Sequence, residues 1–378
     1  MNRRNFIRLT GGGVVLAALG GGLFAATRTP NDALAPWGVA GGYSDPRKNA
    51  LSYAILAPNP HNRQPWMISL DGDDGLTLFF DTEKQLPHTD PFDRQLTIGL
   101  GCFLELLRMA AHADGYDVDI SLFPEGEDTK GLDNGPIARA TFKKATAERD
   151  QLFAHVLNRR SNKEPYDTSR PVPPEALARI LTVARQTRIG GSTGSDDISY
   201  WRQISTKALE LEIATPRTYK ESVDLFRIGK AEITANPDGI DFSGALFETL
   251  ALAGVMTREA LLDTSSTGFQ EGVKAVIANT ETAMGHVWMV TQGNTRHDQI
   301  AAGADWLRVN LACTAEGLGF QPLSQALQEY PEMADIYNET HQRLAPKGGT
   351  VQMLARIGYG PEVAVSPRWP LEAKIGTM

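Results

Sequence analysis

The sequence predicts an α+β protein made of two related halves that are fused in one chain. Residues 99–116 and 301–320 both carry apolar side chains at helical spacing, and both end at a glycine. Short runs typical of β-strands stand around each of these helices. A single offset of 202 residues (303 − 101) relates Gly101 to Gly303, Ala113 to Ala315 and Gly115 to Gly317. We therefore expect each half to be a mostly antiparallel sheet flanked by helices.

The first half is expected to span residues 43–150. An apolar run at 46–56 predicts its first helix. Strands are expected near 66–70 and 76–81, on either side of an Asp-Gly turn at 71–72. A further strand is expected at 117–123, directly after the glycine that ends the long helix.

The second half is expected to span residues 151–378. Pro173 and Pro174 open a helix whose apolar positions fall on one face. The polar stretch 187–198 is expected to be a loop, and 216–272 a helical insertion that forms a lid. Strands are expected at 285–291 and 351–359.

Composition limits the classes of protein to consider. The chain has 378 residues, 42% hydrophobic and 22% charged, which is typical of a globular protein with a sizeable core. Its net charge of −8 argues against nucleic acid as a partner, because phosphate contacts need a basic face. Cys102 and Cys313 lie in apolar helical patterns, so we expect two buried thiols, with a disulfide as the alternative. No cluster with metal-ligand spacing occurs, and we predict no metal site.

Residues 1–30 have the layout of an export signal. Arg3, Arg4 and Arg8 precede an apolar run at 9–26, and the arginine pair is typical of the twin-arginine signal. We expect the twin-arginine export machinery as a partner, and a periplasmic protein or one anchored to the outer side of the inner membrane. An ordinary membrane anchor is the alternative, which the many glycines of the run weaken. Because that pathway carries folded proteins, it suits a chain that takes its cofactor in the cytoplasm.

Two short segments carry the candidate chemistry. Residues 159–163 read RRSNK and offer planar guanidinium donors, a hydroxyl and a point charge, which together suit an anion. The alternative is an ordinary solvated basic patch. Residues 57–66 read APNPHNRQPW, and this bulk of proline, asparagine, histidine and tryptophan exceeds what a connecting loop needs.

Taken together, these segments resemble the nitroreductase family of flavin enzymes, in its single-chain Acg-type branch. In that family an Arg-x-Ser-x-Arg/Lys segment holds FMN from one subunit, and a Pro-Ser-x-x-Asn-x-Gln-Pro-Trp loop reaches the same flavin from the other. The segment 90–95, DPFDRQ, is also similar to that branch; its alternative is a turn capped by Asp90 with an Arg94 salt bridge. The FMN-binding residues that the resemblance implies are Pro58, Asn59, Asn62, Gln64, Arg159, Arg160, Ser161, Lys163, Leu323, Ser324, Gln325 and Arg368.

The resemblance also implies a role for each group. Arg159 and Arg368 would hold the FMN phosphate, and Ser161 would donate to phosphate or ribityl oxygens. Lys163 would lie at the N1–C2=O edge of the flavin, where reduction places negative charge. The other ring contacts would come from Asn59, Asn62 and the backbone N–H groups of Leu323, Ser324 and Gln325.

Trp66 is expected to pack in the core. We name no catalytic residue. His61 is expected to satisfy local hydrogen bonds, with proton donation to a substrate as its alternative role.

Since each half holds a different part of the motif set, the resemblance implies one FMN per chain and a monomer. The expected function is an FMN-dependent oxidoreductase that reduces a flat small-molecule acceptor, such as a nitroaromatic or a quinone. Two alternatives remain. One is a protein that holds FMN under a closed lid without turnover, and the other is a scaffold that binds no flavin.

Overall fold

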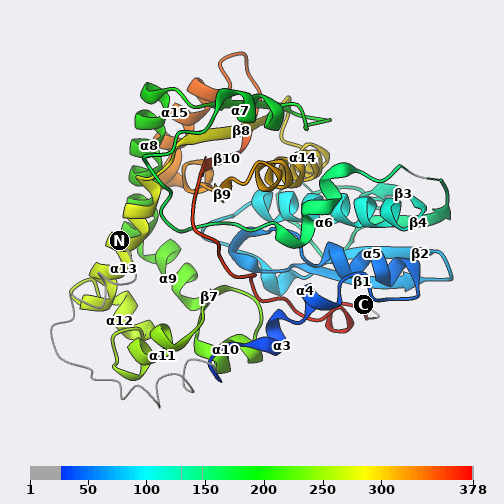
Figure 1. Ribbon diagram of the computed structural model, residues 1–378, viewed down its shortest axis with the longest axis horizontal. Coiled ribbons are helices and arrows are strands. Elements are labelled where there is room, and N and C mark those ends of the chain that lie inside the picture. The colour runs from blue at the N-terminus through cyan, green and yellow to red at the C-terminus, as the bar shows by residue number, and fades with distance from the viewer. Residues whose placement is uncertain (1–26, 129, 147, 377–378) are drawn as a thin grey trace.

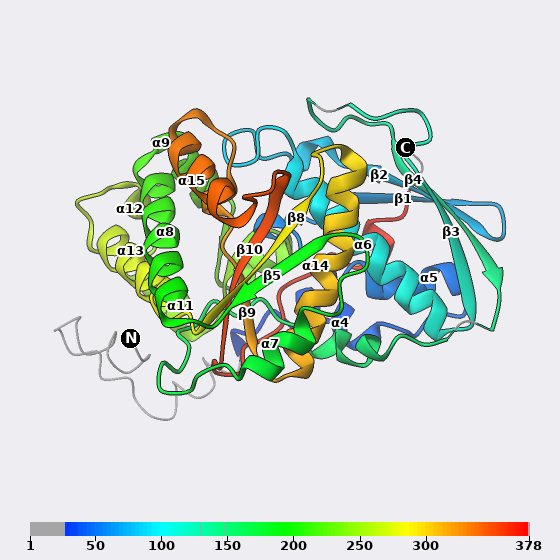
Figure 2. The same cartoon turned by 90° about the horizontal axis from the view of Figure 1, so that it is seen from above.

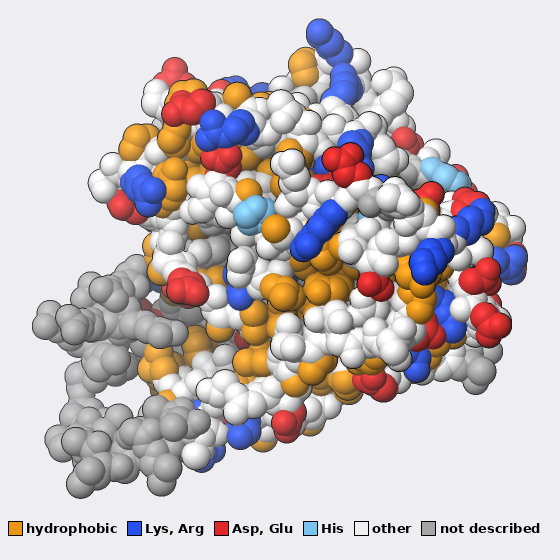
Figure 3. Space-filling model, turned by 45° about the vertical axis from the view of Figure 1, so that its right-hand side comes forward, with side chains coloured by type: hydrophobic (Ala, Val, Ile, Leu, Met, Phe, Trp, Pro, Cys, Tyr) orange, Lys and Arg blue, Asp and Glu red, His pale blue; other side chains and the backbone are white. Residues whose placement is uncertain are grey.

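The computed structural model describes residues 27–128, 130–146 and 148–376. The arginine pair and the apolar run of the expected export signal lie outside these residues. The described chain contains two four-stranded antiparallel sheets, which stand apart in Figure 1, and a small two-stranded sheet. The expected α+β class is confirmed. Figure 3 shows acidic and basic side chains interspersed on the face in view.

The first sheet contains β1 (Trp66–Asp71), β2 (Gly75–Phe80), β3 (Tyr116–Leu122) and β4 (Pro136–Lys144) in the order β1-β2-β4-β3. Gly72 has a φ of 54°, which allows the tight turn between the first two strands. Three of these strands lie where the sequence predicts them. The strand β4 was not predicted, although its alternating burial is clear once it pairs with both β2 and β3.

The second sheet repeats this order. It contains β5 (Arg188–Ser192), β8 (Gly285–Thr291), β9 (Gly319–Pro322) and β10 (Thr350–Gly358) in the order β5-β8-β10-β9. The expectation of a loop at 187–198 is wrong, because β5 and the start of α8 (Ser195–Ala214) occupy it. Two glycines hide this strand in the sequence. A Cβ at Gly190 would lie 2.4 Å from the Trp288 ring, so a glycine is needed where that ring covers the strand.

The helices α6 (Arg94–Ala113) and α14 (Arg296–Ala315) pack against each other at the centre of the molecule (Figure 2). Both begin about five residues earlier than the sequence predicts, and both have 20 residues. The glycines that follow them, Gly115 and Gly317, have φ values of 79° and 69°, as expected for residues that end helices. Each expected half therefore contains a central helix of the same length that ends at a glycine in the same way, which agrees with the expected duplication.

The two central helices meet at a pair of equivalent glycines. A Cβ at Gly101 would lie 2.3 Å from the carbonyl oxygen of Ile300, and a Cβ at Gly303 would lie 2.0 Å from that of Ile98. Cys102 packs beside this crossing, and its thiol donates to the carbonyl oxygen of Gly303 at 3.1 Å. Each half thus requires a glycine where the backbone of the other half passes.

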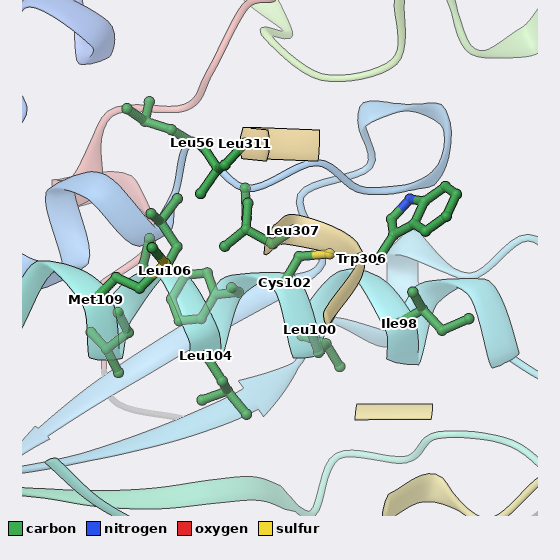
Figure 4. Packing of buried hydrophobic residues seen from close by; sticks show 14 of the residues in the cluster. Leu56, Ile98, Leu100, Cys102, Leu104, Leu106, Met109, Trp306, Leu307 and Leu311 are labelled. Carbon is green, nitrogen blue, oxygen red and sulfur yellow. The ribbon is translucent and has the colours of Figure 1, made fainter. Parts of the chain in front are cut away.

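Figure 4 shows that side chains of α6 pack on two sides of the helix. Cys102 and Leu307 of α14 lie on one side of α6, whereas Leu100 and Leu104 point to the opposite side. The predicted buried thiols are confirmed, since Cys102 and Cys313 are both buried and free.

Two arginines interlock the halves. Arg94, on α6, donates to the carbonyl oxygens of Leu327 at 2.6 Å and Gln352 at 2.7 Å in the second half. Arg296, at the equivalent position of α14, donates to carbonyl oxygens of the first half. Asp90 accepts from the backbone N–H groups at the start of α6, as one alternative proposed. The salt bridge of Arg94 is made with Glu329 rather than Asp90, because the guanidinium points into the other half.

The remaining helices flank the sheets or form the insertion. The insertion contains a parallel pair of short strands and several helices, which Figure 1 shows beside the two main sheets. Its elements are α9 (Pro216–Asp224), β6 (Phe226–Ile228), α10 (Gly229–Ala235), β7 (Ile240–Phe242), α11 (Ala245–Leu252), α12 (Arg258–Leu262) and α13 (Thr267–Thr280). The flanking helices are α3 (Asn31–Leu34), α4 (Pro36–Val39), α5 (Pro46–Ala54), α7 (Pro174–Ile180) and α15 (Ala334–Leu344).

Candidate functional site

The loop between α5 and β1 has an unusual backbone. His61, Asn62 and Gln64 have φ values of 48°, 51° and 51°, in the left-handed region that side chains other than glycine rarely adopt. Each such residue costs about 1–3 kcal/mol, and strain of this kind persists only where the surroundings hold it. Gly99 of α6 leaves room for the loop, because a Cβ there would lie 3.0 Å from the Cβ of Asn59. The loop is therefore a feature that the rest of the fold maintains.

Asn59 and Gln64 shape the loop from within. Asn59 Oδ1 accepts from the Gln64 backbone N–H at 2.7 Å. The Gln64 side chain is fully buried, donates to the Pro237 carbonyl at 2.6 Å and accepts from the Trp369 backbone N–H at 2.9 Å. Both ends of Gln64 are therefore engaged by protein. Pro58 is partly exposed beside them and Trp66 is buried in the core, as expected for the latter.

Two buried arginines converge on the carbonyl groups just before the loop. Arg159 Nη2 donates to the Leu56 carbonyl at 2.9 Å, and Arg368 Nη2 donates to the carbonyls of Leu56 and Ala57 at 3.2 Å each. Arg368 Nη1 also donates to Asn62 Oδ1, and Asn62 Nδ2 donates to the Pro367 carbonyl at 3.0 Å. The structure thus brings together segments that lie about a hundred and about three hundred residues apart.

The arginine cluster, defined as Arg159, Arg160 and Arg368, concentrates three positive charges. Within the described part of the chain, none of the three forms an ion pair with a carboxylate. Burial, together with the smaller effect of the charge of Arg159, lowers the pKa of Arg368 to about 9, and burial lowers the pKa of Arg159 to about 10. Arg368 Nε is buried and has no hydrogen-bond partner among the residues that the structure describes. An anion would relieve both the repulsion and the unsatisfied donor.

Trp37 packs against the arginine cluster, although the sequence did not predict it as a residue of the site. Its ring lies 5.9, 5.2 and 5.6 Å from the guanidinium carbons of Arg159, Arg160 and Arg368. Its indole N–H donates to the Ser366 carbonyl at 2.8 Å, which fixes the ring in place. Trp37 precedes the expected start of the first half at residue 43, and no motif marks it apart from its lone position in the run APWGV.

Lys163 shares a charged neighbour with this cluster, because the charge of Asp241 in β7 acts on both Lys163 and Arg368. The Lys163 side chain is exposed to solvent, yet surrounding protein lowers the pKa of its ammonium group, against the opposing effect of Asp241. Burial lowers the pKa of His61 to about 4, and the charge of Lys163 contributes to that shift. Lys163 of the second half therefore faces the loop of the first half, with Ser161 partly exposed two residues before it.

The predicted backbone contacts at Leu323, Ser324 and Gln325 are only partly available. Leu323 is buried, and its N–H donates to the Leu354 carbonyl at 2.8 Å, because the pairing of β9 with β10 continues for one residue. This N–H is therefore not free to face a flavin, which corrects the expectation for that residue. Ser324 and Gln325 are partly exposed where a short 3₁₀ turn begins, and the Gln325 side chain hydrogen-bonds to Glu212.

The insertion docks on the strained loop. The Gly239 N–H donates to the Asn62 carbonyl at 3.2 Å, next to the Gln64 contact with Pro237. Asp238 forms ion pairs with Lys84 at 2.7 Å and with Arg227 at 2.8 Å. The first half therefore holds the insertion down through both backbone and charged contacts.

A second set of contacts reaches the loop from another side of the insertion. Glu221 of α9 accepts from the Thr89 hydroxyl at 2.6 Å. His61 Nε2 lies 3.1 Å from Ser222 Oγ, also of α9, and Ser222 lies 3.3 Å from Glu212 Oε1 of α8. His61 thus forms a local hydrogen bond, as expected. Its partner Ser222 is itself hydrogen-bonded to the buried carboxyl group of Glu212.

No family model matches the sequence. The chain is similar to several proteins of Mycobacterium tuberculosis (strain ATCC 25618 / H37Rv). The "Uncharacterized protein Rv3127" is 24% identical over 333 residues, which cover 86% of this chain and 91% of the relative. The "Putative NAD(P)H nitroreductase acg" is 25% identical over 346 residues, which cover 87% of this chain and 95% of the relative.

Two solved structures are also similar to parts of the chain. The FMN-dependent nitroreductase NfnB of Mycobacterium smegmatis, in complex with NADPH, is 18% identical; the match covers 59% of this chain and 96% of NfnB with a TM-score of 0.35. A structure named as a "putative nitroreductase" of Anabaena variabilis is 10% identical; the match covers 81% of this chain and 82% of that one with a TM-score of 0.39.

Proposed function

We propose that this nitroreductase-like chain is an FMN-dependent oxidoreductase that passes electrons to a flat acceptor, such as a nitroaromatic or a quinone. The meeting of the strained loop with the arginine cluster carries the proposal. Asn62 of the first half bonds Arg368 at the end of the second, so both halves contribute to one site. The relatives named as nitroreductases agree with this reading.

The residues present fit FMN in charge and in donor type. Within residues 27–128, 130–146 and 148–376, the three guanidinium groups of the arginine cluster have no carboxylate partner, and Arg368 Nε is a buried donor without an acceptor. A phosphate monoester supplies the negative charge and the acceptor oxygens that such a cluster lacks. We assign the phosphate to Arg159 and Arg368, and the ring edge that gains negative charge to Lys163.

Bound flavin would supply the hydride chemistry, and the protein supplies placement, charge and access. Asn62 fixes the Arg368 guanidinium, and Trp37 closes the cluster from the other side. Gln64 holds the insertion on the loop through the Pro237 carbonyl. Of the predicted contacts, Asn59 and Gln64 are therefore assigned to shaping the loop, and Lys163 and Ser161 to touching the ligand.

A second candidate is a protein that holds FMN without turnover. The contacts of the insertion with the loop favour it, because Asp238 and Glu221 both bind the insertion to the first half. A lid held this firmly would slow the exchange of both ligand and acceptor. We also propose export by the twin-arginine pathway, in which case NAD(P)H would not be at hand and the electron donor would differ.

The colour and reactivity of the purified chain test both candidates. A yellow protein that NADPH or dithionite bleaches under nitrogen, and that a quinone then re-oxidises with turnover, supports the enzyme. A yellow protein that resists quinone after chemical reduction supports the holding function. A colourless protein that takes up no added FMN overturns both. Arg159→Ala should lose the flavin, whereas Arg343→Ala, which removes an exposed arginine paired with Asp197, should keep it.

A further inference from the structure

We propose that Glu212, Ser222 and His61 form a proton path that supplies the proton consumed when a quinone-type acceptor is reduced at the site. The inference rests on the proposed function and adds to it the source of the proton. The path runs from α8 through α9 of the insertion to the strained loop. Ser222 Oγ lies 3.3 Å from Glu212 Oε1 and 3.1 Å from His61 Nε2, so one hydroxyl bridges the two titratable groups.

Glu212 is a buried carboxyl group that can hold a proton. Its exposed fraction is 6%, and amide and hydroxyl groups are its partners: Gln328 Nε2 donates to Oε2 at 3.0 Å, and the Gln325 and Ser222 side chains contact it as well. Among the described residues no basic side chain pairs with it. Burial raises the pKa of Glu212 to about 7, and the charge of Glu221 on α9 adds to the increase. Glu212 is thus protonated in part of the molecules at neutral pH.

His61 is placed to pass a proton onward. Its left-handed backbone, with a φ of 48°, holds the ring against Ser222. The other ring nitrogen, Nδ1, is buried and has no hydrogen-bond partner in the described part of the chain. In the proposed path the acceptor is the partner of Nδ1. The charges of Lys163 and Arg63 oppose a lasting positive charge on the ring, beyond the effect of burial. His61 therefore passes a proton on rather than storing it, and storage is left to Glu212.

The path exists only while the insertion is docked. Ser222 lies on α9, and its neighbour Glu221 is held by the Thr89 hydroxyl and by the backbone N–H groups of His88 and Thr89 at 2.9 Å each. Lifting α9 would remove the bridging hydroxyl from between Glu212 and His61. Closure of the lid and supply of the proton are thereby linked.

The proton balance is simple. Reduction of a quinone to a hydroquinone consumes a hydride, which the proposed cofactor supplies, and one proton. The Glu212 O–H proton moves to Ser222 Oγ as the Ser222 hydroxyl proton moves to His61 Nε2, and the Nδ1–H of the ring is given up to the reduced acceptor. To reset the path, a proton from water enters at His61 Nδ1 and the two transfers run in reverse, which returns a proton to the Glu212 carboxylate. A one-electron acceptor such as ferricyanide consumes no proton and does not need the path.

The decisive comparison is between these two acceptors. Glu212→Gln should lower the rate of quinone reduction about tenfold or more, because general acid catalysis contributes at least that much where a proton is transferred. Ferricyanide reduction should be unchanged. The matched control is Glu210→Gln, which changes an exposed carboxyl group on the same helix. Ser222→Ala should repeat the loss and Ser222→Thr, which keeps a hydroxyl, should recover most of the rate.

Two further readouts separate this inference from the proposed function. Wild-type quinone reduction should fall as pH rises through about 7, and Glu212→Gln should lose that dependence. Infrared spectra of the wild type at pH 6 should show the band of a protonated carboxyl group that Glu212→Gln lacks, whether or not flavin is bound. Quinone rates that neither Glu212→Gln nor Ser222→Ala changes, or a Glu212 that is ionised at pH 6, would overturn the proton path. If the wild type binds no flavin or reduces neither acceptor, the proposed function fails instead.

Discussion

Replacing Asn62 by glycine removes the side chain that joins the loop to Arg368 and leaves the backbone free to keep its left-handed conformation. Asn62 contributes two side-chain hydrogen bonds, one from the Arg368 guanidinium and one to the Pro367 carbonyl at 3.0 Å. A hydrogen bond that involves a charged group is worth about 1.5–3 kcal/mol. If losing it displaces Arg368 from the ligand, FMN affinity should fall roughly tenfold to a hundredfold.

Asn62→Ala separates this contact from backbone strain. Alanine loses the same two bonds and must also adopt a φ of 51°, which costs about 1–2 kcal/mol for a residue with a Cβ. Both variants should therefore release FMN faster to a similar degree. Only the alanine variant should lose the additional free energy of unfolding, which urea denaturation would measure.

The assay is the recovery of FMN fluorescence after dilution of the loaded protein. Asn134→Gly is the matched control, because it makes the same change at an exposed bend. The reasoning is refuted if Asn62→Gly releases flavin at the wild-type rate while Arg159→Ala empties the site. The loop of the first half would then not act on the ligand at all.

Further outcomes are expected. Gly303→Ala should lower the free energy of unfolding by about 1–3 kcal/mol or more, because its Cβ would lie 2.0 Å from the Ile98 carbonyl oxygen. Urea denaturation would measure this loss, and an unchanged urea midpoint would contradict the close crossing of α6 and α14. Glu212 has a folded pKa of about 7 against an ordinary value of 4.5, so its contribution to the free energy of unfolding should be fully present below pH 4.5. That contribution of about 3 kcal/mol should be lost as pH rises through 7, and a Glu212→Gln variant with an equally steep loss over this range would refute the assignment. Lys163→Ala should lower the flavin potential in a redox titration more than it weakens binding of oxidised FMN, and equal effects would remove Lys163 from the ring edge. Acid release of flavin should give about one equivalent per chain, and light scattering on protein lacking residues 1–30 should show a monomer; two equivalents or a tight dimer would contradict one shared site.

Much of the fold follows from local pattern. The long central helices and the turn at Gly72 were readable because spacing and glycine placement are local properties of the sequence. The strand β5 was not readable, because Gly190 is required by the Trp288 ring of another strand and Gly191 by the Leu177 side chain of α7. That requirement depends on tertiary contact and leaves no periodic signal.

The sequence predicted residues of the candidate site where they belong to a motif of a known family, and it did not predict the other residues of the site. Asn62 and Arg368 were predicted to share a site, and the structure joins them directly. Gln64 was predicted to contact the ligand, yet its amide is occupied by backbone groups of distant segments. Trp37 and Glu212 were missed because a lone tryptophan and a helical glutamate acquire their roles only from neighbours far away in the chain.

The position of Trp37 has a consequence for the order in which the protein is made. Trp37 emerges from the ribosome early, but the Ser366 carbonyl that holds its indole N–H lies 329 residues later. Arg368, which the Trp37 ring also covers, is the last residue of the arginine cluster to be synthesised. Its backbone N–H donates to the Ala33 carbonyl at 2.8 Å. A nascent chain therefore keeps the cluster open until its final residues leave the ribosome. A chain that stops short of Ser366 would fold much of both sheets and still have no means of closing the site.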